Sequence, residues 1–187
     1  MIRVGIVGFG LMGRTHAAAY VQSKKATITA IADPRQEKVE SPVVVGKIEG
    51  HGDAQFDPST VERFDDAQSL FESGTVDAVS ICSPTPDHVN QTIAAINAGL
   101  HVLVEKPLGV KSAEAHRAVV ATERRPDLVV MPAMCMRFWP GWSWLASAVR
   151  ERTYGSVLSA TFTRLGAMPG WAGFYKDADL SGSAILD

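Results

Sequence analysis

The chain has 187 residues, enough for one large domain or for one domain and part of another. Its net charge of −2 at pH 7 gives no electrostatic case for binding nucleic acid or an anionic membrane surface, and no apolar run is long enough to span a membrane. Cys82 and Cys135 match no metal or redox spacing, and no histidine pair has ligand spacing with a carboxylate. We therefore expect a cytoplasmic protein without a metal site.

The N-terminal residues carry the pattern of a dinucleotide-binding βαβ unit. An apolar strand is expected over 2–7, and it runs into the glycine-rich turn Gly8-Phe9-Gly10-Leu11-Met12-Gly13. A helix is expected over 11–21 and a second strand over 28–32, directly before Asp33. Asp33 follows the last glycine at the spacing of about 20 residues that is typical of this unit.

Each residue type in the turn has a physical reason to be there. Gly8 allows a tight turn out of the strand, Gly10 lets the backbone approach a pyrophosphate, and Gly13 lets the helix pack closely on the sheet. The first turn of the helix, with Leu11 and Met12, offers N–H groups and a partial positive charge to phosphates. The alternative is a glycine-rich turn in an ordinary α/β protein without a cofactor.

The choice of cofactor depends mainly on Asp33. Its carboxylate would accept hydrogen bonds from both hydroxyls of the adenosine ribose, and its charge would repel a 2′-phosphate. The sequence therefore predicts NAD rather than NADP, although Arg35, two residues later, would soften that preference.

Strands and helices alternate again after an irregular loop expected over 36–60. We expect strands over 61–64, 76–82, 101–104 and 128–134. Helices are expected after the N-caps Asp66, Thr85 and Ser112, and they end near residues 71, 98 and 124. This alternation predicts an α/β fold of Rossmann type, a doubly wound parallel sheet with helices on both faces.

The composition changes after Met136, since all four tryptophans lie at or beyond residue 139. A helix is expected over 142–150, and the alternation over 157–163 predicts a half-exposed strand. The chain is therefore divided into a dinucleotide-binding domain over 1–136 and a second region over 137–187.

Ligands of open α/β sheets bind beyond the carboxyl ends of the strands, which selects the loop Glu105-Lys106-Pro107. A lysine there would lie beside the nicotinamide and could exchange a proton with a substrate hydroxyl during hydride transfer. The alternative is a surface loop in which Glu105 and Lys106 are solvated. His16, on the first helix, is expected to pack in the core or to act through another residue.

The order of motifs along the chain resembles the Gfo/Idh/MocA oxidoreductases, the family of glucose–fructose oxidoreductase and inositol dehydrogenase. After the glycine-rich turn, the matching segments are 83–88 (SPTPDH), 105–107 (EKP), 136–140 (MRFWP) and 181–187 (SGSAILD).

The resemblance implies roles for individual residues. Lys106 matches the catalytic lysine of the family, and Asp187 matches the aspartate of its D-x-x-x-H motif, which binds substrate hydroxyls. Arg137 matches an arginine near the cofactor and the substrate. The remaining cofactor contacts are expected in two loops that follow strands, at Ser83, Thr85, His88, Glu105 and Lys106 itself.

The resemblance also implies an activity: hydride transfer between NAD and a secondary alcohol of a sugar, cyclitol or related polyol, in a homo-oligomer for the full-length form. Region 137–187 would then be the incomplete beginning of an α+β domain. The histidine of D-x-x-x-H would fall beyond Asp187, so the resemblance implies a truncated form. A non-catalytic dinucleotide-binding regulatory module, or an inactive fragment of such an enzyme, stays open as the alternative.

Overall fold

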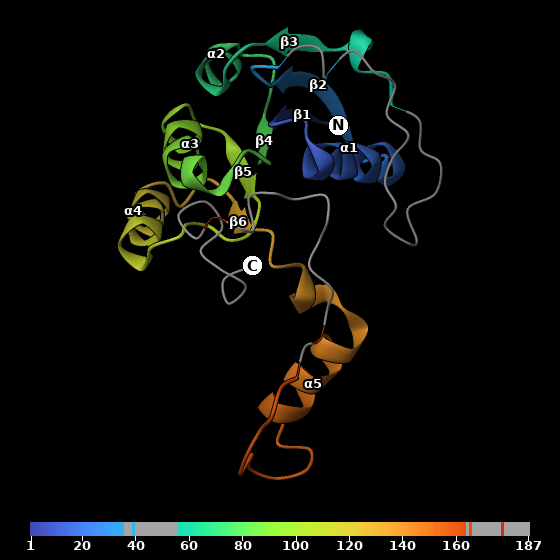
Figure 1. Cartoon of the computed structure of the whole chain (residues 1–187), viewed down its shortest axis with the longest axis vertical. Helices are drawn as coiled ribbons and strands as arrows, with labels where there is room; N and C mark the ends of the chain where they lie inside the picture. Colours follow the sequence, from blue (N-terminus) through green and yellow to red (C-terminus); the bar gives the residue numbers. More distant parts are fainter. Residues whose placement is uncertain (36–38, 40–55, 164, 166–176, 178–187) are drawn as a thin grey trace.

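The computed structural model describes residues 1–35, 39, 56–163, 165 and 177, and its centre is a six-stranded parallel sheet (Figure 1). The strands are β1 (Ile2–Val7), β2 (Ala26–Ala32), β3 (Glu62–Phe64), β4 (Ala78–Ile81), β5 (His101–Val104) and β6 (Val130–Pro132). The helices are α1 (Leu11–Ser23), α2 (Ala67–Glu72), α3 (Thr85–Asn97), α4 (Ser112–Glu123) and α5 (Pro140–Arg150), with short 3₁₀ turns η2 (Pro58–Thr60) and η3 (Cys135–Phe138).

The strand order is β3-β2-β1-β4-β5-β6, and every neighbouring pair is parallel. The chain moves outward from β1 to β3 and then returns to the other side of β1 with β4. The carboxyl ends of β1 and β4 therefore flank a topological switch point, where open sheets of this kind bind ligands. The predicted Rossmann-type α/β fold is confirmed.

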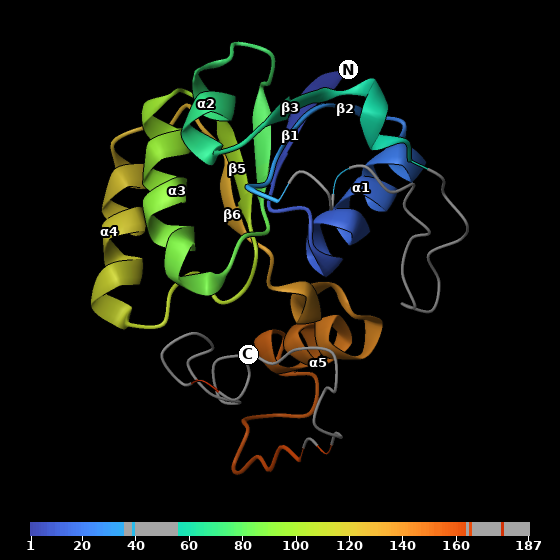
Figure 2. The ribbon, with the colours of Figure 1, turned by 45° about the horizontal axis from the view of Figure 1, so that its top comes forward.

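Helices cover both faces of the sheet, as Figure 2 shows with α1 on one side and α2, α3 and α4 on the other. On the α1 face, Ala17 and Ala18 pack with Ile6, Ile28 and Ile31. The opposite face is a second apolar cluster, with members such as Leu70, Val79, Ile81, Ala95 and Ile96. Adjacent residues of one strand point to opposite faces, so β1 contributes to both clusters.

Several predicted boundaries differ from the observed ones for local reasons. Asp66 caps α2 as expected, because its carboxylate accepts the backbone N–H of Ser69 at 2.9 Å. Pro84 and Lys111, however, occupy the N-cap positions of α3 and α4, so Thr85 and Ser112 are the first helical residues. Most of the expected loop over 36–60 lies outside the described residues.

The prediction of a strand over 157–163 is wrong. Residues 156–163 belong to no strand in the described part of the chain and are exposed throughout; Leu158 is 97% exposed. Alternation alone does not form a strand, because the backbone groups need a neighbouring strand with which to pair. Of this segment's side chains, Phe162 stacks on Trp142 of α5 with ring centroids 5.7 Å apart.

Helix α5 lies apart from the sheet and extends away from the other helices in both views (Figures 1 and 2). No residue of α5 is buried, although Trp142, Leu145 and Val149 give it an apolar side. The division of the chain near residue 136 stays a prediction. No helix in the described residues is long and apolar enough to cross a membrane.

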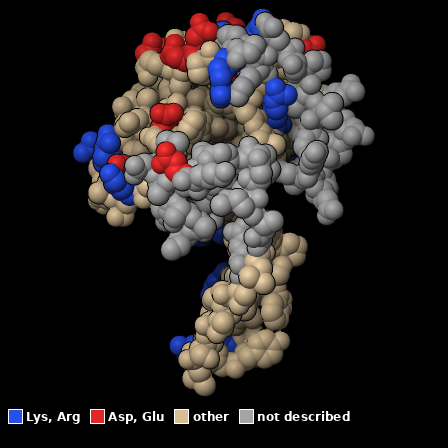
Figure 3. Space-filling view, in the orientation of Figure 1, with Lys and Arg blue, Asp and Glu red and all other residues tan. Residues whose placement is uncertain are grey.

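The charged side chains are mixed on the face drawn in Figure 3. Acidic side chains gather at the end where α2 and β3 lie, and basic ones are scattered over the rest of this face. The described residues of this face therefore form no continuous basic stripe.

An ion pair joins the start of β1 to the residue before β4. Arg3 Nη2 lies 2.6 Å from Asp77 Oδ1, and the Arg3 backbone N–H donates to Asp77 Oδ2 at 2.9 Å. The hydrogen bonds from Arg3 lower the pKa of Asp77 from 3.8 to about 2. Asp77 therefore stabilises the fold above about pH 4, and this contribution is lost as the pH falls through about 2.

We predict that Asp77→Asn lowers the thermal unfolding midpoint at pH 7 by about 2 °C, a small effect because the pair is solvated. At pH 2 the difference from the wild type shrinks, since the Asp77 carboxyl is then about half protonated in the folded protein and almost fully protonated in the unfolded chain. Thermal unfolding at both pH values measures this. An equal difference at both would show that the substitution acts through packing rather than charge.

Candidate functional site

The glycine-rich turn brings the start of α1 close to the strand that precedes it. Gly8 has φ +82°, and a Cβ built there would lie 2.7 Å from the backbone nitrogen of Ser83. A Cβ at Gly13 would lie 2.1 Å from the carbonyl oxygen of Gly8. Both positions therefore require glycine for steric reasons.

Gly10 differs from the other two glycines. It is the N-cap of α1, has φ −78°, and a Cβ built on it would meet no atom within 4 Å. The protein's own packing does not require glycine here, but the space beside it is open toward the N–H groups of the first helical turn. This geometry fits a dinucleotide pyrophosphate, which binds at helix N-termini that the backbone leaves accessible.

Asp33 is fixed beside this turn at the carboxyl end of β2. It is 1% exposed, and its carboxylate accepts the backbone N–H groups of Phe9 at 2.8 Å and Arg35 at 2.9 Å. The Arg35 guanidinium is over half exposed and lies 3.6 Å from the same carboxylate. Arg14 stacks over the Phe9 ring at 5.3 Å. A carboxylate held next to the glycine-rich turn fits the ribose of NAD.

We predict that Gly13→Ala destabilises the fold by about 1–3 kcal/mol, because the new methyl group would collide with backbone. Gly10→Ala is the matched control: it costs much less stability but weakens NADH binding, since its methyl group occupies the open space at the helix N-terminus. Thermal unfolding and NADH fluorescence titration separate the two effects. Unchanged NADH affinity in the Gly10 variant would show that the pyrophosphate does not approach this turn.

The segment after β4 brings Ser83, in the loop, and Thr85 and His88, in the first turn of α3, to the same end of the sheet. Ser83 Oγ donates to Gln91 Oε1 at 2.6 Å, and Thr85 is buried in the first turn of α3. His88 is 1% exposed, with Nδ1 2.8 Å from the carbonyl oxygen of Pro107 and Nε2 2.8 Å from that of Ser83. His88 thus connects the loop after β4 to the loop after β5.

The loop after β5 begins with Glu105, whose side chain is 8% exposed. Glu105 Oε2 accepts the backbone N–H of Lys106 at 3.0 Å, and Oε1 lies 3.0 Å from His16 Nε2 on α1. The peptide bond between Lys106 and Pro107 is cis. The predicted catalytic lysine therefore follows a buried carboxylate that is itself bonded to the dinucleotide-binding helix.

Behind Glu105, a chain of polar side chains continues between α1 and β4. His16 Nδ1 lies 3.2 Å from Ser80 Oγ, and Tyr20 Oη lies 2.6 Å from the same hydroxyl. Every group is satisfied if Tyr20 donates to Ser80, Ser80 donates to His16 Nδ1, and His16 Nε2–H donates to Glu105. Burial raises the pKa of Tyr20, so its hydroxyl keeps the proton that it donates.

Cys82 lies near Glu105, at one end of this chain of polar side chains. Burial, and then the negative charge of Glu105, raises the pKa of its thiol well above the usual value, which keeps it protonated and unreactive. Cys135, in η3, is exposed. No group of three metal-ligating side chains is found in the described part of the chain.

The predicted site residues separate into two sets. The structure brings the glycine-rich turn, Asp33, the loop after β4 and the loop after β5 to one end of the sheet. Arg137 lies in η3, beyond β6, and is exposed, whereas Asp187 lies outside the described residues. The interpretation of His16 as acting through another residue fits its contact with Glu105.

Sequence reasoning did not single out Ser80 and Tyr20. One signal was available for Tyr20, because it lies four residues after His16 and shares its helix face. Ser80, a polar residue inside an apolar strand, is 0% exposed, and its hydroxyl needs a partner at that depth.

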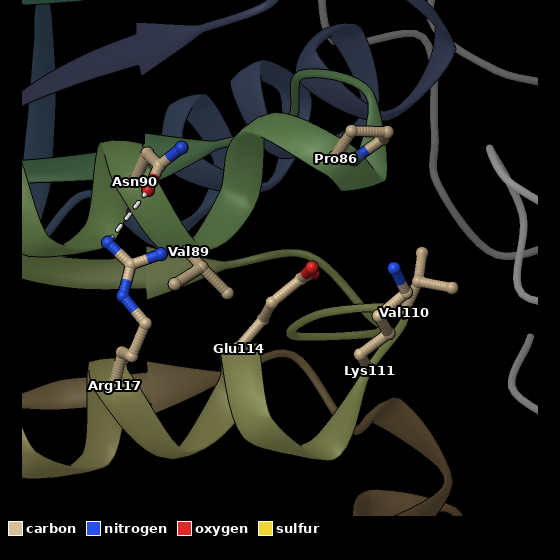
Figure 4. Close-up of a pocket in the computed structure, with 7 residues that line it drawn as sticks. All are labelled: Pro86, Val89, Asn90, Val110, Lys111, Glu114 and Arg117. Atoms are coloured by element: carbon tan, nitrogen blue, oxygen red, sulfur yellow. Dashed lines mark hydrogen bonds between the residues drawn. The ribbon is translucent and has the colours of Figure 1, made fainter.

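A pocket of about 460 Å³ lies elsewhere, between α3 and α4 (Figure 4). Val89 lines it, Lys111 and Glu114 extend over it from α4 and its N-cap, and Arg117 donates to Asn90 across it at 3.3 Å. None of the predicted site residues lines this pocket, so it is separate from the candidate site.

Comparison with known proteins matches residues 2–133 to the GFO_IDH_MocA family model, described as "Oxidoreductase family, NAD-binding Rossmann fold". Among curated proteins, the chain is 35% identical to the rhizopine catabolism protein MocA of Rhizobium meliloti over 65% of the chain and 34% of that protein. It is 29% identical to myo-inositol 2-dehydrogenase of Thermotoga maritima over 82% of the chain and 42% of that protein.

Among solved structures, the scyllo-inositol dehydrogenase of Lactobacillus casei with bound NAD(H) and scyllo-inositol matches with a TM-score of 0.70 and 25% identity. The match covers 83% of this chain and 42% of that one. A third curated protein, the D-glucoside 3-dehydrogenase of Escherichia coli, is 28% identical over 99% of the chain and 50% of that protein. The chain thus spans at most about half the length of these relatives.

Proposed function

Since the chain belongs to the Gfo/Idh/MocA oxidoreductase family with its NAD-binding Rossmann fold, we propose that it transfers a hydride between NAD and a secondary alcohol of a cyclitol or sugar. The observation that carries this proposal is the contact of His16 Nε2 with Glu105 at 3.0 Å. This contact bonds the helix that follows the glycine-rich turn to the loop that holds Lys106. The backbone of Lys106 is thereby held at the end of the sheet where the dinucleotide would bind.

The residues that would hold NAD follow from the geometry of the turn. Gly8, Gly10 and Gly13, together with the N–H groups of the first turn of α1, would bind the pyrophosphate, and Asp33 would bind the adenosine ribose. When bound, NAD supplies the acceptor or donor of the hydride. Ser83 and the first turn of α3, with Thr85 and His88, would border the ribose groups.

Lys106 is the proposed acid and base. Its Nζ would take the proton of the substrate hydroxyl as the alcohol is oxidised and return it in the reverse direction. Asp187 and Arg137 would bind substrate hydroxyls beside it. The class of substrate is supported by the names of three relatives, two inositol dehydrogenases and a glucoside dehydrogenase.

We predict that the chain binds NADH about tenfold or more tightly than NADPH, a difference of about 1.4 kcal/mol or more. The carboxylate of Asp33 would repel the 2′-phosphate of NADPH. Asp33→Asn keeps the size of the side chain but removes its charge, so it should bring the affinities for NADH and NADPH closer together. Fluorescence titration with both nucleotides measures it. Equal affinities in the wild type would contradict the role of Asp33 in selectivity.

The activity is tested by following NADH formation from NAD with myo-inositol, scyllo-inositol and simple sugars and glucosides. Lys106→Ala is expected to lower turnover by about 100-fold or more while NADH affinity stays unchanged, because the amine transfers a proton and does not hold the nucleotide. Lys111→Ala, an exposed lysine at the start of α4, is the matched control and keeps turnover.

Two results of this assay would count against the proposal. Equal loss of turnover and NADH binding in the Lys106 variant would mean that the lysine serves cofactor binding. NADH binding without turnover on any of these polyols would favour the alternative, a dinucleotide-binding regulatory module.

A further inference from the structure

We propose that His16 and His88 are positioning residues that hold the loop of Glu105, Lys106 and Pro107 from the two faces of the sheet. This proposal rests on the proposed role of Lys106 as acid and base. His16 lies on α1 and His88 on α3, and these helices cover opposite faces (Figure 2). Each histidine contacts the residue on one side of Lys106.

His16 acts on the N-terminal side of the lysine. Its Nε2 donates to Glu105 Oε1 at 3.0 Å, and the other oxygen of that carboxylate accepts the backbone N–H of Lys106 at 3.0 Å. Its Nδ1 is satisfied by Ser80, so the ring is held at both nitrogens. The orientation of His16 therefore fixes the carboxylate, and the carboxylate fixes the amide of Lys106.

His88 acts on the C-terminal side. Its Nδ1 lies 2.8 Å from the carbonyl oxygen of Pro107, and its Nε2 lies 2.8 Å from that of Ser83. Both partners are carbonyl oxygens, which can only accept, so a ring nitrogen of His88 bonds to its partner as a donor. The contact joins the loop of Lys106 to the loop after β4.

A role limited to core packing does not account for this arrangement. Two apolar side chains would fill the same space without the cost of desolvating imidazole nitrogens. Here all four ring nitrogens have hydrogen-bond partners, and one nitrogen of each ring contacts a neighbour of Lys106. Holding the backbone on both sides restricts where the long, rotatable lysine side chain can place its amine.

The experiment is hydrogen–deuterium exchange of the purified chain, read on peptides that cover residues 105–109, without nucleotide or substrate. His16→Ala and His88→Ala are each expected to raise exchange in this segment by about tenfold, because each removes a buried hydrogen bond that closes the loop. Peptides from β2 and α4 should exchange as in the wild type.

Two further variants distinguish positioning from general stability. His16→Gln can donate from its amide to Glu105 as Nε2 does, and it should restore slow exchange. His116→Gln carries the same substitution on an exposed histidine of α4 and should change nothing. If His16→Ala does not fold, Glu105→Asp takes its place: the shorter carboxylate cannot reach both His16 and the Lys106 amide, so the loop should still exchange faster.

Three results would overturn the proposal: unchanged exchange over 105–109 in the alanine variants, an equal rise in β2 and α4, or no rescue by His16→Gln. The failure of the proposed function is seen separately, because exchange is measured without turnover. A loop that loosens as expected, in a protein whose Lys106→Ala variant keeps its activity, would disprove the role of Lys106 and not the contacts.

Discussion

The close approach of α1 to β1 is the constraint on which the candidate site depends. A Cβ at Gly13 would lie 2.1 Å from the carbonyl oxygen of Gly8, so the helix can lie this near the strand only without a side chain at that position. From there α1 directs its N–H groups toward the open space beside Gly10. The same placement brings His16, one turn later, to Ser80 and Glu105.

A polar layer inside an apolar sheet is the second feature of the site. Tyr20, Ser80, His16 and Glu105 form one chain of hydrogen bonds between α1, β4 and the loop after β5. Buried polar groups of this kind weaken a core unless every one has a partner, and here each has one. The layer connects the element that would hold the cofactor to the residue that would transfer the proton.

Local sequence patterns were sufficient for much of the fold. The glycines of the turn, the apolar run of β1 and the spacing to Asp33 predicted the first βαβ unit, since each depends on neighbours in sequence. The prediction of a strand over 157–163 was wrong because a strand also needs a neighbouring strand to pair with, and an alternating sequence does not supply one. The helix caps of α3 and α4 shifted by one residue for a smaller reason, since Pro84 and Lys111 already have extended backbone geometry.

By itself, the sequence determined the family, the NAD-binding Rossmann fold and the glycine-rich turn with Asp33, because these are written in motifs with short spacing. Only the tertiary structure decided that His16 contacts Glu105 and that His88 bridges Ser83 and Pro107. His16 and Glu105 lie 89 positions apart along the chain. Their contact follows from strand order and from the depth at which α1 packs, and neither quantity is encoded in the spacing of a motif.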